Sequence, residues 1–363
     1  MERELSRSNS SMLDLIRGIS SQLVVLGHGI SFCGIAVRFH QPNFPWMQNI
    51  AVVIFFILSG FVISYSLGRK SHRNDYDFSH YFVDRFVRIY TAFIPVLIFI
   101  VAIDLFSQSI NGDLYKYGEA FNARTFIYNL FMFQDYPQFQ YYPLVNVATS
   151  FGSARPLWTV AIEWWIYLFV GVLFFAFKNR SKNVFVYFFI ALLSIVPIYN
   201  LIGGRGNGLT LYWVYGVIIY YIFKCAILKN ISLAKLFIMM IIIIVMACHR
   251  VMDTLQEYDH LFAMYLAGII ILLVEISTRF DFKNIVVRAS TFLASYSYSL
   301  YLIHYSIFDL LVTHYGGGYK VFFVAFTISN VVSYFFGVLF EIHIAKKLKK
   351  AIYDVFHWEY EKK

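Results

Sequence analysis

Long runs of apolar residues alternate with short polar segments along the whole chain. A helix that crosses a bilayer needs roughly 20 mostly apolar residues, and about ten segments meet that requirement. By residue number they are 11–32, 46–67, 89–107, 157–177, 183–202, 209–227, 234–250, 258–277, 291–312 and 320–344. The pattern predicts an all-α integral membrane protein, a bundle of about ten transmembrane helices.

The basic residues predict how this bundle is oriented. If the N-terminus lies in the cytoplasm, every inside segment carries several Lys or Arg residues, from Arg69 and Lys70 to the KKLKK stretch at 346–350, whereas the outside segments carry few. Because cytoplasmic loops have an excess of Lys and Arg, we predict that both termini are cytoplasmic. The net charge of +9 then follows from topology and does not indicate a nucleic-acid partner.

Composition supports the membrane class and excludes several kinds of enzyme. Hydrophobic residues make up 59% of the chain and charged residues 14%, against about a quarter charged in soluble domains. The three cysteines are far apart and form no CxxC pair, so neither a disulfide framework nor a zinc site is expected. No Walker loop, dinucleotide glycine motif or HExxH is present, and we expect no metal and no tightly bound cofactor.

The chain has one irregular region and no sign of a second domain. A long loop at about 108–156, expected outside, holds the Tyr- and Pro-rich stretch QDYPQFQYYP (134–143) and a short apolar piece at 126–133 that is re-entrant or interfacial. We therefore predict a single membrane domain over residues 1–363 with a basic cytoplasmic tail at 345–363. The first apolar run contains Arg17 and lacks a small-residue cleavage site, so we expect an uncleaved helix.

Ionisable residues inside the first predicted span are functional candidates because hydrocarbon makes them costly. They are Asp14, Arg17 and His28. Eleven positions separate Arg17 from His28, which places them on one helix face about 16 Å apart along the axis. Interior polar groups satisfied by neighbouring helices are the alternative, but the alignment favours a functional stripe. Asp14 is expected to pair with Arg17 or to cap the helix start.

Five stretches, in order, resemble the membrane-bound acyltransferase-3 family. The stretches are LDLIRGISSQLVVLGH (13–28), FFILSGFVISY (55–65), DRFVRIY (84–90), RPLWTVAIEWWIYL (155–168) and SYSLYLIH (297–304). The first stretch has the signature of the family, an arginine followed after ten residues by a histidine. One departure is Val53, where many members carry an acidic residue before the FF pair of the second helix. A role for that carboxylate is therefore absent or filled elsewhere.

The resemblance implies an enzyme and its substrates. Such an enzyme moves an acyl group, usually acetyl, from cytoplasmic acyl-CoA, a co-substrate, to an outward-facing hydroxyl of a surface polysaccharide or a lipid-linked saccharide. It implies a multi-pass protein of the plasma membrane, the inner membrane in bacteria. The alternatives are another acceptor, such as an antibiotic, a peptide or a lipid, and a transporter or flippase without acyl chemistry, which intramembrane charges also fit.

On this resemblance the basic residues near the cytoplasmic face bind the donor. Arg85 and Arg88 are one turn apart, so two guanidinium groups meet there and suit CoA phosphates. Positive-inside anchoring explains them equally well. Arg17 lies deeper and is expected at the pyrophosphate or the pantetheine of the donor.

Residues of the outer half are assigned to catalysis and to the acceptor. His28 is either the general base for the acceptor hydroxyl or a covalent acyl relay. Glu163 orients His28 or binds that hydroxyl, unless it is a buried polar tie between helices. Trp158 and His304 are acceptor-site candidates, against interfacial and packed-polar alternatives. Three residues near cytoplasmic helix ends, Glu275, Glu341 and His343, receive no role, and Tyr296, Tyr298 and Tyr301 are expected to pack and to form interhelical hydrogen bonds.

Overall fold

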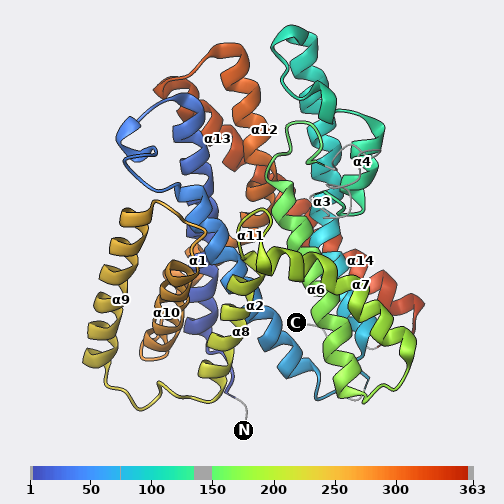
Figure 1. The fold of residues 1–363 in the computed structure, drawn as a ribbon, viewed down its shortest axis with the longest axis vertical. Coiled ribbons are helices and arrows are strands. Elements are labelled where there is room, and N and C mark those ends of the chain that lie inside the picture. Colours follow the sequence, from blue (N-terminus) through green and yellow to red (C-terminus); the bar gives the residue numbers. More distant parts are fainter. Residues whose placement is uncertain (1–2, 74, 135–148, 359–363) are drawn as a thin grey trace. The chain divides into compact units, whose positions relative to one another are not determined.

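The computed structural model describes residues 3–73, 75–134 and 149–358, and this part of the chain is helical without strands. In chain order the α-helices are α1 (Arg7–Cys33), α2 (Met47–Lys70), α3 (Phe78–Ile110), α4 (Ala123–Leu130), α6 (Leu157–Lys178), α7 (Val184–Ile202), α8 (Leu209–Lys224), α9 (Leu233–Thr254), α10 (His260–Ser277), α11 (Asn284–Ser295), α12 (Ser297–Tyr315), α13 (Tyr319–Phe336) and α14 (Ala345–Val355) (Figure 1). Short 3₁₀ helices are η1 (Val37–Phe39), η2 (Gly112–Leu114) and η3 (Gly118–Ala120), and η4 (Gly337–Ile344) is π-helical. The all-α prediction is confirmed for the described residues.

Seven helical runs in this part of the chain are long and apolar enough to cross a membrane. They are α2, α3, α6, α7, α9, α10 and the run from α13 to α14. The remaining predicted segments correspond to α8, which is shorter, and to α1 and α12, which carry more polar residues. The chain is thus a multi-pass membrane protein by the length and composition of its helices, while the number of ten spans and the cytoplasmic termini stay predictions.

Three predicted segments have different limits in the structure. The segment at 291–312 was expected as one helix, but it breaks at Tyr296 between α11 and α12. Hydroxyls of Ser295 and Ser297 donate to the carbonyls of Phe292 and Ala294 at the break, and such bonds compete with continuous helix. The segment at 89–107 belongs to a longer helix that Asp77 caps through the His80 N–H, and the basic tail begins as helix α14. The Tyr- and Pro-rich stretch lies largely outside the described residues.

The chain divides into two compact units. Unit 1 comprises Met1–Lys70 and Asn200–Ser297, and unit 2 comprises Ser71–Tyr199 and Tyr298–Lys363. The prediction of one membrane domain over residues 1–363 is not tested by this division and stays a prediction.

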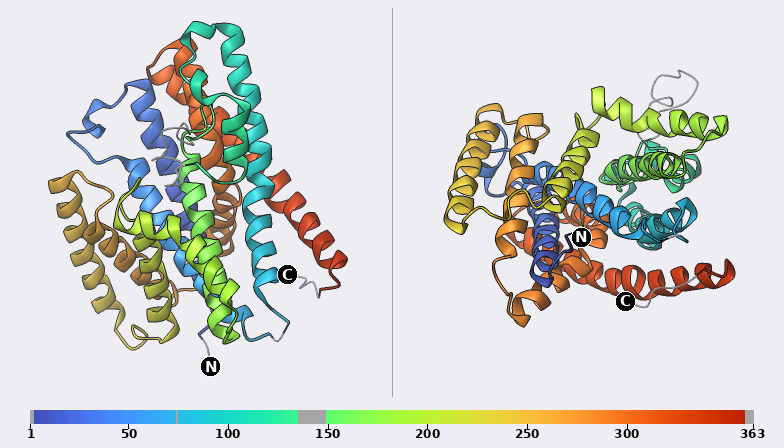
Figure 2. Two further views of the ribbon diagram at one scale, coloured as in Figure 1. Left: turned by 45° about the vertical axis from the view of Figure 1, so that its right-hand side comes forward. Right: turned by 90° about the horizontal axis from the view of Figure 1, so that it is seen from below.

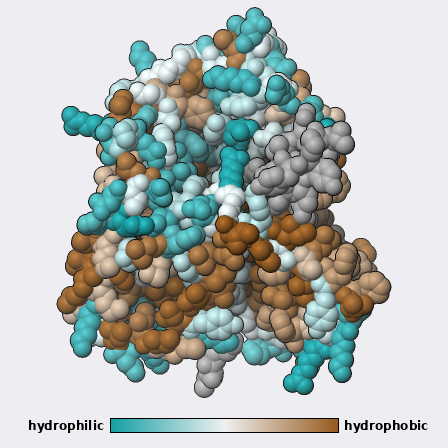
Figure 3. All heavy atoms as spheres, in the orientation of Figure 1, coloured by the Kyte–Doolittle hydropathy of each residue, from teal (hydrophilic) through white to brown (hydrophobic). Residues whose placement is uncertain are grey.

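In unit 1 the helices pack closely where side chains are small. A Cβ atom on Gly60 of α2 would lie 1.9 Å from the Trp213 carbonyl oxygen of α8, and one on Gly216 would lie 2.0 Å from the Ile57 carbonyl oxygen. Only glycine permits this approach, a common means of helix association in membranes. Exposed Ile, Val, Phe and Met side chains cover the outer face of α9, where Figure 3 shows hydrophobic residues in brown, as expected for contact with lipid.

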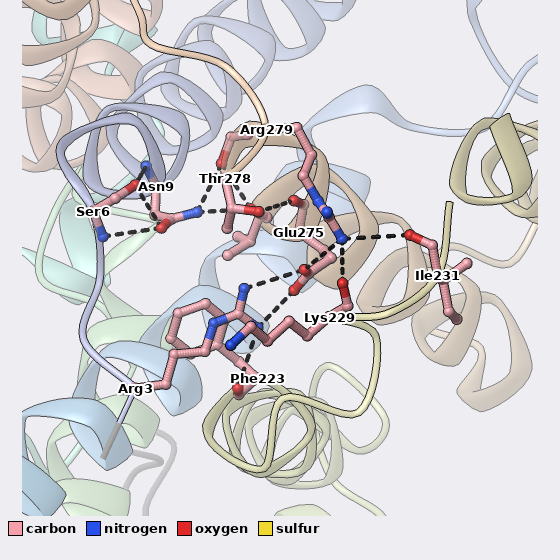
Figure 4. A network of polar contacts seen from close by, with 11 residues as sticks. Arg3, Ser6, Asn9, Phe223, Lys229, Ile231, Glu275, Thr278 and Arg279 are labelled. Atoms are coloured by element: carbon pink, nitrogen blue, oxygen red, sulfur yellow. Dashed lines mark hydrogen bonds and ion pairs between the residues drawn. The ribbon is translucent and has the colours of Figure 1, made fainter. Parts of the chain in front are cut away.

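A polar network ties the N-terminal segment of unit 1 to the ends of α8 and α10 (Figure 4). The Glu275 carboxylate, whose side chain is 1% exposed, accepts hydrogen bonds from Arg3 at 2.7 and 3.1 Å. Arg279 lies 3.7 Å from the same carboxylate and donates to the carbonyls of Lys229 and Ile231. Arg3, Glu275 and Arg279 each have a partner within this network, so the network stabilises the packing of unit 1.

In unit 2, α3 packs against α6, η4 and α14. Helix α14 continues the helical run of α13 and η4 and lies beside α3 (Figure 2). Tyr353 is buried there against Val83 and Val87, and Lys349 pairs with the buried Asp84. The lysines of the KKLKK stretch (346–350) therefore lie on a helix that packs against α3.

Candidate active site

Helix α1 of unit 1 carries two of the predicted site residues, Arg17 and His28. Ser6 caps its start in a reciprocal capping box with Asn9, and Gly34, in the left-handed region at φ 61°, ends it. Because the helix is continuous between these caps, Arg17 and His28 share a face about 16 Å apart along the axis, as the sequence predicts.

Arg17 forms an ion pair one turn away on α1. Its Nη1 lies 3.7 Å from Asp14 Oδ1, and the two side chains are 29% and 31% exposed. The helix starts at Arg7, so Asp14 does not cap it, and the pairing is the alternative that holds. The Arg17 guanidinium is thus paired with a carboxylate of its own helix and is partly exposed.

His28 is half-buried, and its ring centroid lies 6.5 Å from that of Phe32. The start of α2 packs on the preceding residue, since a Cβ atom on Gly27 would lie 2.2 Å from Gln48 Oε1. The imidazole is therefore set on a tightly packed helix yet remains partly accessible, which suits a group that must exchange protons with a substrate.

In unit 2 the second predicted arginine of α3, Arg88, faces a buried carboxylate. Arg88 Nη1 donates to Glu341 Oε2 at 2.9 Å; the Glu341 side chain is 2% exposed and the Arg88 side chain 42%. Glu341 Oε1 accepts from the N–H and the hydroxyl of Ser299 at 2.9 and 2.7 Å. The carboxylate thus fixes one edge of the guanidinium and leaves the rest accessible.

Glu341 and Glu275 receive no role in the sequence analysis, where both lie near predicted cytoplasmic helix ends. In the structure both are buried and ion-paired. Glu341 lies in the π-helical segment η4, and such segments are frequent at functional sites. The signal in the sequence is an acidic residue inside an apolar run.

Arg85 lies among aromatic rings. Its guanidinium carbon is 5.8 Å from the centroid of Tyr81 and 6.0 Å from that of Tyr167. Its Nε is buried and makes no hydrogen bond to any residue that the structure describes. A buried guanidinium N–H without a protein acceptor is costly, so the site favours an anionic partner.

Glu163 of α6 accepts a hydrogen bond from Tyr167, one turn later, and the Tyr167 carbonyl accepts one from Tyr81 of α3 at 3.1 Å. The Tyr298 phenol of α12 is an electrostatic neighbour of Glu163 and Tyr167 as well as of Arg88 and Glu341. Six residues thus form one group, which we call the unit 2 polar cluster: Arg85, Arg88, Glu163, Tyr167, Tyr298 and Glu341. Three of the predicted site residues meet here.

The remaining two predicted residues, Trp158 and His304, are buried in unit 2. Trp158 is 8% exposed and His304 0%. His304 Nδ1 contacts the Leu300 carbonyl oxygen of its own helix at 2.9 Å, and its ring lies 6.2 Å from that of Tyr301. This burial fits packed side chains, and the acceptor-site role of both residues stays a prediction.

A second polar group at the other end of α3 was not predicted. Asp104, 1% exposed, accepts from the Ser153 N–H at 2.9 Å, and Asp309 of α12 accepts from Tyr117 at 2.9 Å. Burial and the nearby Asp309 raise the pKa of the Tyr117 phenol far above its usual range, so it remains a donor. The rule applied to the first helix, that ionisable residues in apolar runs have a reason, would have found both aspartates.

Comparison with known proteins gives one family and one relative. A family model described as "Acyltransferase domain" matches residues 11–342, a range that includes every predicted site residue. An "O-acetyl transferase" of Shigella phage Sf6 is 26% identical over 195 residues, covering 52% of this chain and 53% of the phage protein. The chain thus spans about half the length of this curated relative. No solved structure matches.

Proposed function

The chain belongs to the acyltransferase-3 family, and from that premise we propose that it is a membrane O-acyltransferase that acts between cytoplasmic acyl-CoA and a saccharide hydroxyl. The membership confirms the resemblance that the five sequence stretches indicated, and with it the enzyme class. The name of the phage relative favours acetyl as the acyl group. A surface polysaccharide or a lipid-linked saccharide is the proposed acceptor, and the inner membrane the proposed location.

The observation that carries this proposal is the pair Arg17 and His28 on one continuous helix within the matched range. Their axial separation of about 16 Å is too long for direct contact. It suits a reaction whose donor and acceptor approach from opposite sides of a membrane. Arg17 would then bind the donor and His28 would act on the acceptor.

The donor is held, in this proposal, by arginines. Arg85 and Arg88 lie one turn apart on α3, and Arg85 Nε is buried without a hydrogen bond to the described residues. The phosphate oxygens of CoA are strong acceptors that match guanidinium geometry. Acyl-CoA is therefore a better partner for this pair than a neutral ligand.

The chemistry is a transfer from sulfur to oxygen. As general base, His28 takes the proton of the acceptor hydroxyl while its oxygen attacks the thioester carbon, and the CoA thiolate leaves and is protonated. As a relay, the imidazole attacks the thioester carbon and displaces the CoA thiolate, which is protonated. The acceptor oxygen then attacks the acyl-imidazole, and the imidazole leaves and takes up the hydroxyl proton. Glu163 accepts from Tyr167 in the unit 2 polar cluster, among the arginines proposed for the donor, and its role toward His28 or the acceptor hydroxyl stays a prediction.

The test is the acyl content of the surface glycan in cells that produce His28→Ala at the normal level. We expect complete loss of acylation in this variant and in a deletion strain, measured by mass spectrometry as one missing acyl group. Normal acylation with His28→Ala would remove the catalytic role. Purified protein that passes no label from acetyl-CoA to the same glycan would favour a flippase instead.

A further inference from the structure

Tyr298 places a phenol in the unit 2 polar cluster at the first turn of α12. The guanidinium carbon of Arg88 lies 5.6 Å from the centroid of its ring. Its hydroxyl oxygen is shielded from solvent and makes no hydrogen bond to any residue that the structure describes. The prediction of an interhelical hydrogen bond for this residue is therefore wrong within the described residues.

Tyr301, one turn later on the same helix, shows the contrast. Its hydroxyl is 2.6 Å from Thr159 Oγ1 and 3.3 Å from the Pro156 carbonyl oxygen, both at the start of α6. Here the expected interhelical hydrogen bond is confirmed. The two phenols thus lie on one helix, one turn apart, and they differ in whether the described residues provide a hydrogen-bond partner for the hydroxyl.

The position of Tyr298 is held from its neighbours. Ser299 gives both its N–H and its hydroxyl to Glu341, and Glu341 binds Arg88. The backbone beside the phenol is therefore fixed to the same carboxylate that fixes the arginine. A buried hydroxyl held in place without an acceptor costs stability, and ligand sites are where such a cost is recovered.

The unbonded donors of the cluster indicate what the partner of the hydroxyl is. Arg88, Glu163 and Glu341 are all electrostatic neighbours of Tyr298, and in the same cluster Arg85 Nε is a second buried donor without a hydrogen bond to the described residues. Two buried donors, the Tyr298 hydroxyl and Arg85 Nε, call for a ligand that supplies oxygen acceptors. Acyl-CoA offers these in its phosphates and in the carbonyls of its pantetheine and acyl groups.

We propose that the Tyr298 hydroxyl donates a hydrogen bond to an oxygen of the acyl-CoA donor beside Arg88, so that Tyr298 is a donor-binding residue. This inference rests on the proposed function, because it takes acyl-CoA as the donor. The bonded oxygen belongs either to a phosphate or to a carbonyl of the pantetheine and acyl portion.

The experiment compares Tyr298→Phe with Tyr301→Phe in the full-length protein in lipid nanodiscs. Binding of acetyl-CoA is measured by calorimetry, and the thermal unfolding midpoint is measured on the same samples. Tyr298→Phe should bind acetyl-CoA about fivefold to tenfold more weakly, the loss of one hydrogen bond. Its midpoint should be unchanged or raised, because the ligand-free protein loses a buried hydroxyl that has no acceptor. Tyr301→Phe should bind within twofold of wild type and unfold at a lower temperature, because it loses its bonds to α6.

Two fragments of acetyl-CoA identify the oxygen that accepts the hydrogen bond from Tyr298. Weaker binding of 3′-phosphoadenosine 5′-diphosphate by Tyr298→Phe would place the bond on a phosphate, and weaker binding of S-acetylpantetheine alone would place it on a carbonyl. Unchanged acetyl-CoA affinity in Tyr298→Phe, or a lowered midpoint like that of Tyr301→Phe, overturns the inference while leaving the proposed function intact. Wild-type protein that neither binds acetyl-CoA nor transfers label overturns both.

Discussion

Two buried glutamates, Glu275 in unit 1 and Glu341 in unit 2, show how similar ion pairs serve different purposes. In unit 1, Glu275 is bound by Arg3 and approached by Arg279, and these arginines also donate to the carbonyls of Phe223, Lys229 and Ile231 (Figure 4). In unit 2, Glu341 Oε2 accepts from Arg88 Nη1, and Glu341 Oε1 accepts from the N–H and the hydroxyl of Ser299. We call the first network closed, because Arg3 and Arg279 donate to acceptors of unit 1 itself.

The unit 2 polar cluster is open by comparison. Arg88 is 42% exposed against 18% for Arg3, and Arg85 Nε and the Tyr298 hydroxyl are buried without hydrogen bonds to the described residues. A closed network contributes stability, whereas an open one keeps donors for a ligand at some cost. The difference predicts that substitutions in unit 1 change stability and that substitutions in the cluster change affinity.

The largest effect is expected from Glu275→Ala. Removing the carboxylate leaves Arg3 and Arg279 without their shared acceptor, and breaking one side of a buried ion pair costs about 3 kcal/mol or more. We expect a markedly lower thermal unfolding midpoint and normal acetyl-CoA affinity in the protein that remains folded. An unchanged midpoint would show that the network does not stabilise the folded state.

Arg85→Met is expected to lower affinity for acetyl-CoA and to leave stability nearly unchanged, the reverse of Glu275→Ala. The side chain keeps its apolar length against Tyr81 and Tyr167 but loses its donors, so acetyl-CoA should bind about 10- to 100-fold more weakly with little change in stability. Titration calorimetry and thermal unfolding of one preparation measure both quantities.

The matched control for Arg85→Met is Arg3→Met, which removes a guanidinium from the closed network. It should lower stability by about 1–2 kcal/mol and leave acetyl-CoA affinity unchanged. If both variants lost affinity equally, or both lost stability equally, the distinction between an open and a closed network would be wrong.

Much of the fold follows from local pattern. Runs of apolar residues predict where helices lie, because hydrocarbon demands helices of about 20 residues. The alignment of Arg17 with His28 and the one-turn spacing of Arg85 and Arg88 follow from helix periodicity alone. These features needed no knowledge of which helix lies beside which.

The partners of these residues could not be predicted in this way. Arg88 and Glu341 are 253 residues apart in sequence, and periodicity does not say which helices meet. Tyr298 and Tyr301 stand in one short motif with the same surroundings in sequence, yet only Tyr301 faces Thr159. Whether a polar residue is satisfied depends on what a distant helix places opposite it, so the open cluster is visible only in three dimensions.

The smallest effect concerns another closed contact of unit 1, at the start of α10. Asp259 caps this helix through the Phe262 N–H at 2.8 Å and accepts from Arg250 at 3.0 and 2.7 Å. The hydrogen bonds from Arg250, with a smaller part from Phe262, hold the pKa of the Asp259 carboxyl below its ordinary value. Because the folded state favours the ionised form, this stabilisation is complete above the ordinary pKa of about 4 and is lost as the pH falls through the lower folded value.

The substitution Asp259→Asn removes the charge-dependent stabilisation that Arg250 gives to Asp259. Asparagine still caps a helix but carries no charge for Arg250, so the variant should be less stable than wild type by about 1 kcal/mol at neutral pH. As other carboxyl groups titrate in both proteins, the informative quantity is the difference in unfolding midpoint between them as the pH is lowered. That difference should begin to shrink below about pH 4 and vanish as the pH falls through the lower folded pKa of Asp259, where the wild-type carboxyl also becomes neutral. A difference that stays constant down to acid pH would mean that the Arg250 contact adds no charge-dependent stability, and that this part of unit 1 is held by its cap alone.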